Sequence, residues 1–503
     1  MSSRPNRTGR GHVVRVAAAV DADDGPAVVD AARETTGDVP VLRTGPTGVE
    51  AVEPLLLATA KDRTALFPAA DPETSRAVAK ALADSELPTA EAEAVVEHDT
   101  ERADLPVPST GPLSVGRREA LGPCGWVDPL DPEAVASVGD EEPSAAARVL
   151  GRGRGDAAAG DPVGDEWETV SEADGDPVVV VNANDADARQ RGDRTLLAGA
   201  PHTVFDAAAT VADHVGATDV VVHLNEADAA LHDHLRAAVD RIDDPDRRPQ
   251  LVAGPDEYRA IEPTAALEAL EGADRIEPRI QPPGPARHGL YGRPTVVHTP
   301  RTFAQVRRAL LDPRAVDAAA DDPGTRLVTV TGDVASPATV ELPSEATLST
   351  ARAAVEPTGD VEFACVGGRL GGFVRSLDVP ATTDGLAEAG VGTDGSVELL
   401  SEERCPVAEA GTRVNFAAEE NSGRCVPGRE GTVQLAELLR DVYNGSFEPE
   451  KMRELQRVMA SSSNCLIGAQ APRPARTALE EFEPAFRAHA DGRCPNGTCS
   501  LDT

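Results

Sequence analysis

The stretch VVVVNANDAD, residues 178–187, decides how the centre of this 503-residue chain folds. Four consecutive valines predict a strand that is buried on both faces, as in a parallel sheet covered by helices. The polar residues that follow, 182–187, come at the carboxyl end of that strand, where open α/β sheets bind their ligands. They predict a ligand-binding loop, although the same residues also suit Asx turns.

Helices and strands alternate on both sides of this stretch, which predicts a doubly wound α/β core. On its carboxyl side we expect a helix, a strand and a second helix over residues 204–215, 219–223 and 226–242. On its amino side we expect helices over 132–138 and 145–150 and an irregular glycine-rich loop over 151–167. Backbone N–H groups in that loop, with Arg152 and Arg154, could cradle a phosphate or a flavin. A plain surface loop is the alternative.

The chain before this core predicts a small α/β domain of its own. Strands are expected over residues 13–16, 39–42 and 65–68, with helices over 25–35 and 72–83. A proline-rich polar stretch follows and is typical of a linker.

The chain after the core changes pattern twice. Short strands with glycine and proline turns predict a β-rich domain over residues 326–400. Amphipathic helices are then expected over 433–443, 448–462 and 475–487. These patterns divide the chain into a disordered N-terminus, an α/β domain, a linker, the core, a β-rich domain, a helical bundle and a tail, over residues 1–12, 13–99, 100–116, 117–325, 326–400, 401–490 and 491–503.

The charge composition excludes several classes of protein. Lys and Arg number 48 against 85 Asp and Glu, giving a net charge of −37, and three of the basic residues are Lys. A chain this acidic lacks the general phosphate footprint of a nucleic-acid binder. It has no apolar run of about 18 residues to span a membrane and no signal-peptide core. The acid excess runs along the whole chain, which we interpret as a cytoplasmic protein of a salt-accumulating halophile.

Seven cysteines are present, mostly near the C-terminus. An odd number in a large cytosolic chain does not indicate a disulfide framework. Cys425 and Cys465 cannot complete a four-ligand metal site alone, and two buried apolar cysteines are the alternative. Cys494 and Cys499 could pair, bind a metal or belong to a mobile tail.

Six motifs follow one another in a fixed order between about residues 117 and 489. They are RGRG with GDEW (152–155 and 164–167), VNANDADARQRGDR (181–194), PH (201–202), YRAIEPT (258–264), IEPRIQPPGPARHGLYGRPTVVHTPRT (276–302) and ENSGRCVPGREGT (420–432). Together they are similar to the motifs of the NADH-binding flavoprotein subunit of complex I and of NAD-linked hydrogenases. The resemblance covers roughly three quarters of the chain, and residues 12–99 resemble the thioredoxin-like domain of hydrogenase-type relatives.

The resemblance implies both a fold and a reaction. The fold would comprise a thioredoxin-like domain, a Rossmann-like domain for FMN and NADH, a β-grasp domain and a C-terminal bundle of helices that carries a 4Fe–4S cluster. NADH would pass hydride to FMN, and single electrons would leave through iron–sulfur centres to a redox partner or a soluble acceptor. A peripheral position on a membrane complex is compatible with this role. The residues retained at the family's cofactor-binding positions are Gly153, Arg154, Gly155, Asn182, Asp185, Asp187, Tyr258, Glu262 and Thr302, and the remaining metal-ligand candidates are Cys425 and Cys465.

The sequence departs from the family at positions that contact the cofactors. Ser422 and Gly428 replace two cluster cysteines, so a complete four-thiolate 4Fe–4S site is not available. Residues 13–99 contain no cysteine, so no 2Fe–2S centre forms from their own thiols. Glu166 replaces the lysine before Trp167 and would repel the phosphate of FMN.

These departures leave two main hypotheses. The first is a divergent NADH:acceptor oxidoreductase that holds FMN on the Gly153–Gly155 loop. The second is a non-catalytic scaffold or regulatory paralogue within a larger redox assembly. A changed ligand, such as another nucleotide or a small anion, is the remaining possibility.

Overall fold

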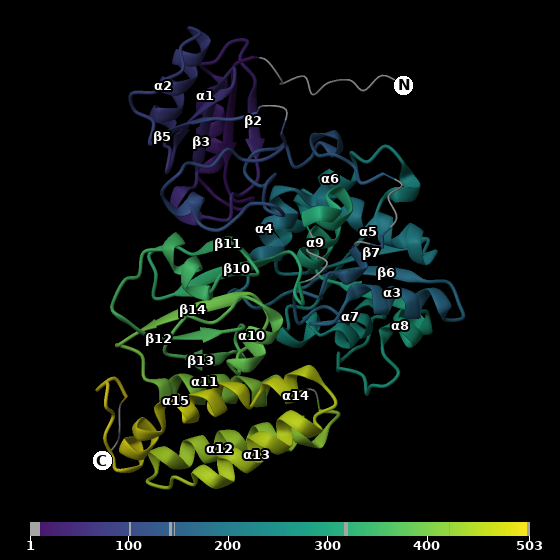
Figure 1. The fold of residues 1–503 in the computed structure, drawn as a ribbon, viewed down its shortest axis with the longest axis vertical. Helices are drawn as coiled ribbons and strands as arrows, with labels where there is room; N and C mark the ends of the chain where they lie inside the picture. Colours follow the sequence, from purple (N-terminus) through teal and green to yellow (C-terminus); the bar gives the residue numbers. More distant parts are fainter. Residues whose placement is uncertain are drawn as a thin grey trace.

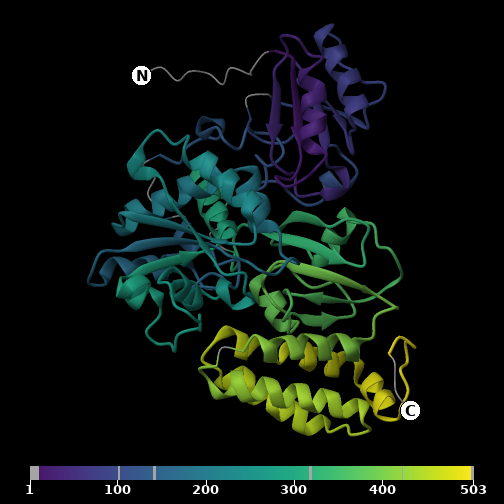
Figure 2. The same cartoon turned by 180° about the vertical axis from the view of Figure 1, so that it is seen from behind.

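The computed structural model describes residues 11–99, 102–139, 143–144, 146–315, 320–421 and 423–499. They form three β-sheets and a helical C-terminal part, arranged along one long axis (Figure 1). The N-terminal sheet lies at one end, two sheets lie side by side in the middle, and the last helices lie at the opposite end, as the reverse view also shows (Figure 2). Among the described residues, no helix is long and apolar enough to cross a membrane.

The N-terminal sheet has the order β2-β1-β3-β4-β5, with β1 parallel to β2 and antiparallel to β3. Its strands are β1 (Val13–Ala17), β2 (Val41–Thr44), β3 (Leu55–Ala60), β4 (Arg63–Phe67) and β5 (Ala94–Glu97). Helices α1 (Gly25–Arg33) and α2 (Pro72–Ala83) pack on one face of the sheet. The α2 helix agrees with the prediction, because Asp71 caps it by accepting from Thr74 N at 2.7 Å. The prediction omitted β3 and β5.

The central sheet is fully parallel, in the order β8-β7-β6-β9. Its strands are β6 (Val178–Ala183), β7 (Asp219–Asn225), β8 (Gln250–Gly254) and β9 (Thr295–His298). Val179 and Val181 face the cluster that includes α5 (Pro201–Val215) and α9 (Pro300–Leu311). Val178 and Val180 face the opposite cluster, which includes α7 (Pro263–Leu270). Both faces of β6 are therefore buried, as the four valines predict.

The remaining helices of this central part are α3 (Val163–Glu172), α4 (Gly192–Gly199), α6 (Ala229–Val239) and α8 (Pro285–His288). Two predictions here were wrong. Residues 132–138 form only a 3-10 turn over Pro132–Ala134, because Asp206 accepts from Val138 N and holds the following chain in a non-helical path. The stretch 151–167, predicted to be irregular, contains the start of α3, because Val163, Trp167 and Val170 supply a buried helical stripe.

A third prediction was partly wrong. Residues 145–150 contain a 3-10 turn over Ala146–Arg148 rather than a longer helix, and residue 145 lies outside the described residues. So do residues 1–10 of the expected disordered N-terminus and the first two residues of the expected linker.

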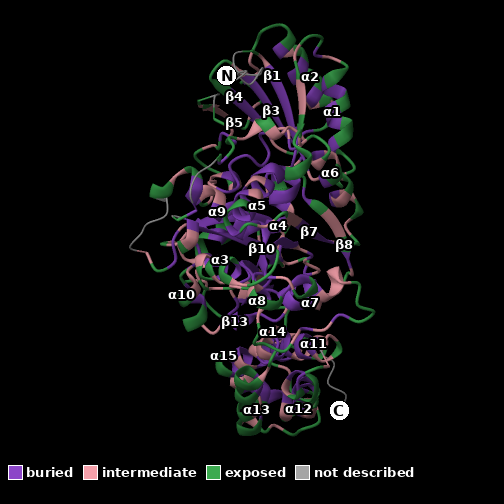
Figure 3. Cartoon of the chain, turned by 90° about the vertical axis from the view of Figure 1, so that its right-hand side faces the viewer, coloured by how far each residue is buried: buried purple, intermediate pink, exposed green. Residues whose placement is uncertain are grey.

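The third sheet is mixed, in the order β11-β10-β14-β12-β13, with β10 parallel to β14. Its strands are β10 (Thr325–Gly332), β11 (Ala338–Pro343), β12 (Val361–Val366), β13 (Gly372–Val374) and β14 (Ser396–Ser401), and α10 (Thr383–Glu388) lies beside them. One side of this sheet joins the central core, while Phe363, Phe373 and Leu400 pack with the C-terminal helices. Figure 3 shows the buried residues following the strands and the inner faces of the helices.

The C-terminal part is helical, as predicted. Its helices are α11 (Pro406–Glu419), α12 (Thr432–Tyr443), α13 (Pro449–Ser462), α14 (Leu466–Gln470) and α15 (Arg473–Ala490). A π-helical turn, Pro427–Gly431, leads into α12. After α15 the chain turns back, and Asn496 Nδ2 donates to Glu362 Oε2 at 2.8 Å and to Glu402 O at 3.0 Å.

Candidate functional site

The predicted glycine loop lies at the carboxyl end of β6. Asn182 Nδ2 donates to Gly155 O at 3.0 Å and to Ile261 O at 2.8 Å. Asn182 is fully buried, so these two bonds use both hydrogens of its amide. The structure thus brings Gly155 and Asn182 together, but through a contact between protein groups.

Side chains fill the space beside the loop. A Cβ atom added at Gly155 would lie 2.8 Å from Thr299 Cγ2 and 2.9 Å from Ile261 Cδ1. One added at Gly153 would lie 3.2 Å from Arg301 Cζ. Close packing of Thr299, Ile261 and Arg301 therefore accounts for the small residues at these two positions.

A carboxylate of the loop itself occupies the nearest anion position. Asp156 accepts hydrogen bonds from Gly153 N at 2.7 Å, Thr299 N at 2.6 Å and Thr302 Oγ1 at 2.9 Å. Thr299 is the N-cap residue of α9, so the carboxylate sits at the positive end of that helix. Burial raises the pKa of Asp156, and these donors oppose the rise. The predicted residue Thr302 is thereby bound to Asp156.

Arg154 is the centre of a buried charge network. Its guanidinium reaches Asp185 Oδ1 at 3.0 Å and Asp394 Oδ2 at 3.1 Å and lies 3.7 Å from the centroid of the Tyr258 ring. Burial alone would lower the pKa of Arg154, but Tyr258, Asp185 and Asp394 raise it above its usual value. Beside it, the guanidinium of Arg301 holds Asp193, with Nε at 3.0 Å and Nη2 at 2.5 Å from Asp193 Oδ2. Of the predicted residues, Arg154 thus contacts two others, Asp185 and Tyr258.

The last two predicted acids hold backbone groups in place. Asp187 Oδ2 accepts from Arg369 N at 2.7 Å, which ties the loop after β6 to the third sheet. Glu262 caps α7, accepting from Ala265 N at 2.8 Å and from Thr264 Oγ1 at 2.6 Å. Burial raises the pKa of Glu262.

A second buried cluster adjoins Asp156. Glu166 Oε1 accepts from Val297 N at 2.8 Å, and burial raises the pKa of Glu166 to about 8. His298 Nε2 accepts from Trp167 Nε1 at 2.9 Å, and burial lowers the pKa of His298 to about 3. His298 Nδ1 lies 3.8 Å from both Asp156 Oδ1 and Glu166 Oε2.

Sequence reasoning noticed Glu166 as a departure from the family, but it did not identify Asp156. The signal available was an acid directly after RGRG.

The cysteine pair near α12 is closely packed. The Sγ atoms of Cys425 and Cys465 lie 3.7 Å apart, and both residues are buried. A Cβ added at Gly428 would lie 2.9 Å from Cys425 Sγ, 3.5 Å from Cys465 Sγ and 3.5 Å from Gly468 Cα. Ser422 lies outside the described residues. Two thiols with glycines packed against them do not fit a 4Fe–4S cluster, which requires four ligands.

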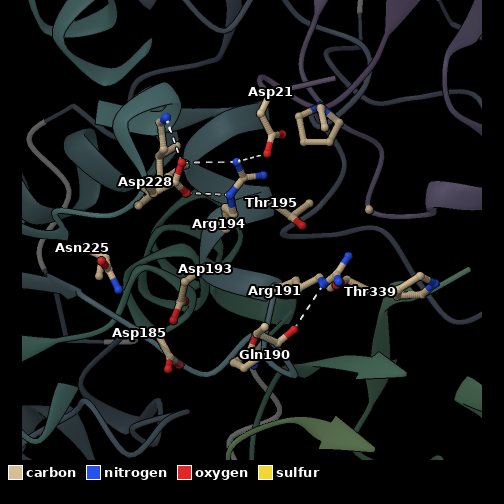
Figure 4. A pocket seen from close by; sticks show the side chains of 18 of the residues that line it. Asp21, Asp185, Gln190, Arg191, Asp193, Arg194, Thr195, Asn225, Asp228 and Thr339 are labelled. Carbon is tan, nitrogen blue, oxygen red and sulfur yellow. Dashed lines mark hydrogen bonds and ion pairs between the residues drawn. The ribbon is translucent and has the colours of Figure 1, made fainter. Parts of the chain in front are cut away.

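A cavity of about 700 Å³ opens at the carboxyl ends of β6 and β7, against the N-terminal sheet (Figure 4). Two ion pairs of Arg194 lie in the cavity wall, with Nε 2.7 Å from Asp228 Oδ2 and Nη2 3.1 Å from Asp21 Oδ2. Arg191 pairs with Glu50. Acids outnumber bases on its walls, which also include Asp193 and Asp256, and the predicted residues Asp185 and Asp187 line it too.

Two family models match the chain. The Nuo51 FMN-binding domain matches residues 145–308. The iron–sulfur binding region of NADH-ubiquinone oxidoreductase-F matches residues 408–489, the segment that contains the cysteine pair.

Individual relatives extend the likeness over most of the chain. The F subunit of the NADH-quinone oxidoreductase of Streptomyces coelicolor is 30% identical over 371 residues, covering 68% of this chain and 82% of the relative. The HndC subunit of the NADP-reducing hydrogenase of Solidesulfovibrio fructosivorans is 26% identical over 428 residues, covering 76% of this chain and 86% of the relative.

A crystal structure of an NAD⁺-reducing NiFe-hydrogenase in the H₂-reduced state has a fold similar to that of this chain. It aligns over 95% of this chain and 84% of its own, with a TM-score of 0.64 and 23% identity. The chain therefore belongs to the family of the NADH-binding FMN flavoprotein subunits of complex I and NAD-linked hydrogenases.

Proposed function

We propose that this chain serves as a non-redox component, structural or regulatory, of a larger redox assembly. The observation that carries the proposal is the Asp156 carboxylate on Gly153 N, Thr299 N and Thr302 Oγ1. It fills the anion position beside the glycine loop with the chain's own group.

The family model that matches residues 145–308 is that of an FMN-binding domain. We infer from the side chains beside this loop that they do not fit FMN as the resemblance implies. A flavin phosphate would have to displace Asp156 and its buried hydrogen bonds. Glu166 offers no positive charge to compensate, since it stands where the family has a lysine. The flavin ring would also compete with Thr299, Ile261 and Arg301 for the space beside Gly153 and Gly155.

The iron–sulfur centres through which electrons would leave are also incomplete in the described part of the chain. At the position of the family's cluster motif, the described residues offer two thiols, Cys425 and Cys465, where a 4Fe–4S cluster needs four ligands. The N-terminal residues 13–99 contain no cysteine. NADH oxidation in this family depends on single electrons leaving through such centres, so the loss of both supports a role without electron transfer.

We place this protein in the cytoplasm of a salt-accumulating cell, on the strength of its net charge of −37. The strand orders and the C-terminal helices support the proposal of a thioredoxin-like domain, a Rossmann-like domain, a β-grasp domain and a helical bundle. The domain boundaries expected from the sequence belong to the same proposal. The relatives are named as subunits of larger enzymes, which supports the proposal that this chain also has a partner subunit.

A second candidate function is binding of a nucleotide, NADH included, without its oxidation. The cavity of about 700 Å³ supports it, because it lies at the carboxyl edge of a parallel sheet and includes Asp185 and Asp187. Titration of the purified protein with NADH, followed by nucleotide fluorescence, tests this candidate.

The deciding experiment is an absorbance spectrum of the protein purified in multimolar KCl, before and after incubation with excess FMN. We expect a colourless protein that retains no flavin after gel filtration. A matched variant, Asp156→Gly with Glu166→Lys, removes the carboxylate from the loop and restores the lysine that the family has, and it is expected to retain more FMN than the native chain. A yellow native protein that bleaches on addition of NADH would overturn the proposal and establish an oxidoreductase.

A further inference from the structure

The thiols of Cys425 and Cys465 meet where the turn before α12 packs against α14. Cys425 lies two positions before the π-helical turn Pro427–Gly431, and Cys465 is the N-cap residue of α14. The two residues are 40 positions apart in sequence, yet their Sγ atoms lie 3.7 Å apart. Both are free thiols, so the structure holds the pair in its reduced form.

The backbone comes close to both sulfurs because each cysteine is followed three positions later by a glycine, Gly428 after Cys425 and Gly468 after Cys465. Gly468 N donates to Cys465 Sγ at 3.4 Å, which orients this sulfur. A Cβ atom added at Gly468 would lie 2.9 Å from Gly428 Cα, and one added at Gly428 would lie 2.9 Å from Cys425 Sγ. A side chain at either glycine would push the two segments apart, so the glycines keep the thiols in contact.

The two sulfurs lie just beneath the surface. Cys425 is 7% exposed and Cys465 is 8% exposed. Their sequence neighbours face solvent, since Arg424 and Val426 flank the first cysteine and Asn464 precedes the second, and all three are exposed. A small molecule in solution therefore reaches the pair after a small displacement of these connecting segments.

Two other cysteines show what an inert thiol looks like in this chain. Cys124 and Cys365 are 0% and 1% exposed, and burial raises the pKa of both thiols to about 12. The Sγ of Cys124 donates to Thr195 O, and that of Cys365 donates to Gly368 O. Deep burial and a high pKa keep a thiol unreactive. The cysteine pair differs from these two in its depth and in its sulfur-to-sulfur contact.

Closing the pair requires a movement that its surroundings allow. A disulfide has its sulfurs about 2.05 Å apart, so the Sγ atoms must approach from 3.7 Å. Cys425 lies in the connection between α11 and α12, and Cys465 lies in the connection between α13 and α14. Connecting segments adjust more readily than the interior of a helix. Neither helix therefore has to unwind for the bond to form.

We propose that Cys425 and Cys465 form a thiol–disulfide exchange site, at which oxidation by a low-molecular-weight disulfide links the turn before α12 to α14. One cysteine thiolate attacks a sulfur of the small disulfide, which gives a mixed disulfide and releases one small thiol. The second cysteine then attacks the protein-bound sulfur and releases the second small thiol. Two electrons and two protons pass from the pair to the small disulfide, whose S–S bond breaks as the protein S–S bond forms.

The bond closes the chain that contains α12 and α13 into a loop, and such a loop restricts the unfolded state. Oxidation should therefore raise the Tm of the chain. The site goes beyond the proposed function and requires only that no iron–sulfur cluster occupies the two thiols. Binding of FMN at the glycine loop would overturn the proposed function and leave this inference as it stands.

The test is incubation of the fully reduced chain with excess cystine in multimolar KCl, followed by iodoacetamide, unfolding and digestion with trypsin. Cleavage after Arg424, Arg429 and Arg457 places Cys425 in peptide 425–429 and Cys465 in peptide 458–476. We expect mass spectrometry to find these two peptides joined, and separate again after reduction. Peptide mapping distinguishes this bond from links among the remaining thiols of the helical part, which gather around His489: Cys405, Cys494 and Cys499.

Variants separate the pair from the other cysteines. Cys425→Ser and Cys465→Ser should each reduce the joined peptide at least tenfold and abolish the rise in Tm that this bond adds on oxidation. Cys124→Ser, which alters a deeply buried cysteine, is the matched control and should form the joined peptide like the native chain. Circular dichroism of each variant before oxidation separates loss of the site from loss of the fold.

Two results would overturn the inference. One is a folded native chain in which peptides 425–429 and 458–476 stay unlinked in excess cystine, or become linked only after unfolding in urea. The other is iron bound to the pair in protein purified anaerobically, detected as absorbance near 400 nm that Cys425→Ser removes.

Discussion

Replacing Arg301 by Met tests whether the buried charge network stabilises the central part of the molecule. Asp193 receives Nε, Nη2 and the backbone N of Arg301, and both side chains are almost completely buried. Removing the guanidinium leaves Asp193 as a buried charge without its partner, which typically costs about 3–5 kcal/mol of unfolding free energy. We expect Arg301→Met to fall in that range at neutral pH.

The remaining contacts refine this magnitude. In Arg301→Met the backbone N of residue 301 still has Asp193 as its acceptor at 2.9 Å. In the double variant Arg301→Met with Asp193→Leu, that N–H loses its acceptor, which costs about 1–3 kcal/mol. The double variant should therefore recover part of the lost stability, but not all of it.

Urea unfolding in multimolar KCl measures these differences through the fluorescence of Trp167, in a Trp126→Phe background that removes the only other tryptophan. The control is Arg236→Met, which breaks the exposed pair with Asp233 and should change stability by less than about 1 kcal/mol. The reasoning is refuted if Arg301→Met costs no more than this control.

Two further predictions concern pH and packing. The pKa of Glu166 is about 8 in the folded chain and 4.5 in the unfolded chain, so the contribution of Glu166 to stability is present below pH 4.5 and is lost as the pH rises to 8. The free energy of unfolding should therefore fall by up to about 1.4 kcal/mol per pH unit in urea melts from pH 5 to pH 8. Glu166→Gln should flatten that decline. Gly155→Ala should destabilise the chain by about 1–3 kcal/mol in the same assay, with partial recovery when Ile261→Val removes the Cδ1 atom at 2.9 Å.

Local sequence patterns predicted those strands and helices whose formation depends mainly on residues close together in the sequence. Val178–Val181 form a strand because four β-branched residues suit a sheet buried on both faces. The α2 helix begins where Asp71 and Pro72 provide a cap and a first residue. The missed strand β3, LLLATA, has no alternation to mark it, and its pairing with β1 and β4 is set by segments elsewhere in the chain.

The site was harder to predict because its partners are distant in sequence. The role of Asp156 depends on Thr299 and Thr302, more than 140 residues later. The environment of Glu166 depends on Val297 N, 131 residues away. The motifs located the loop, but no pattern in the glycine stretch itself indicates that an acid there closes the anion position. Likewise the sequence shows the short spacing of Cys494 and Cys499, but only the structure brings the ligand atoms of Cys405 and His489 within 4.8 Å of theirs.

The tethering of Asp156 has a consequence for how the molecule depends on its surroundings. A free anion at a helix start adds stability by mass action, so its contribution rises and falls with the concentration of that ligand in the cell. A carboxylate carried three residues from Gly153 has a fixed effective concentration and is present in every copy as soon as the chain folds. The abundance of this protein should therefore be insensitive to the supply of flavin, even when growth on limiting riboflavin depletes the flavoproteins around it.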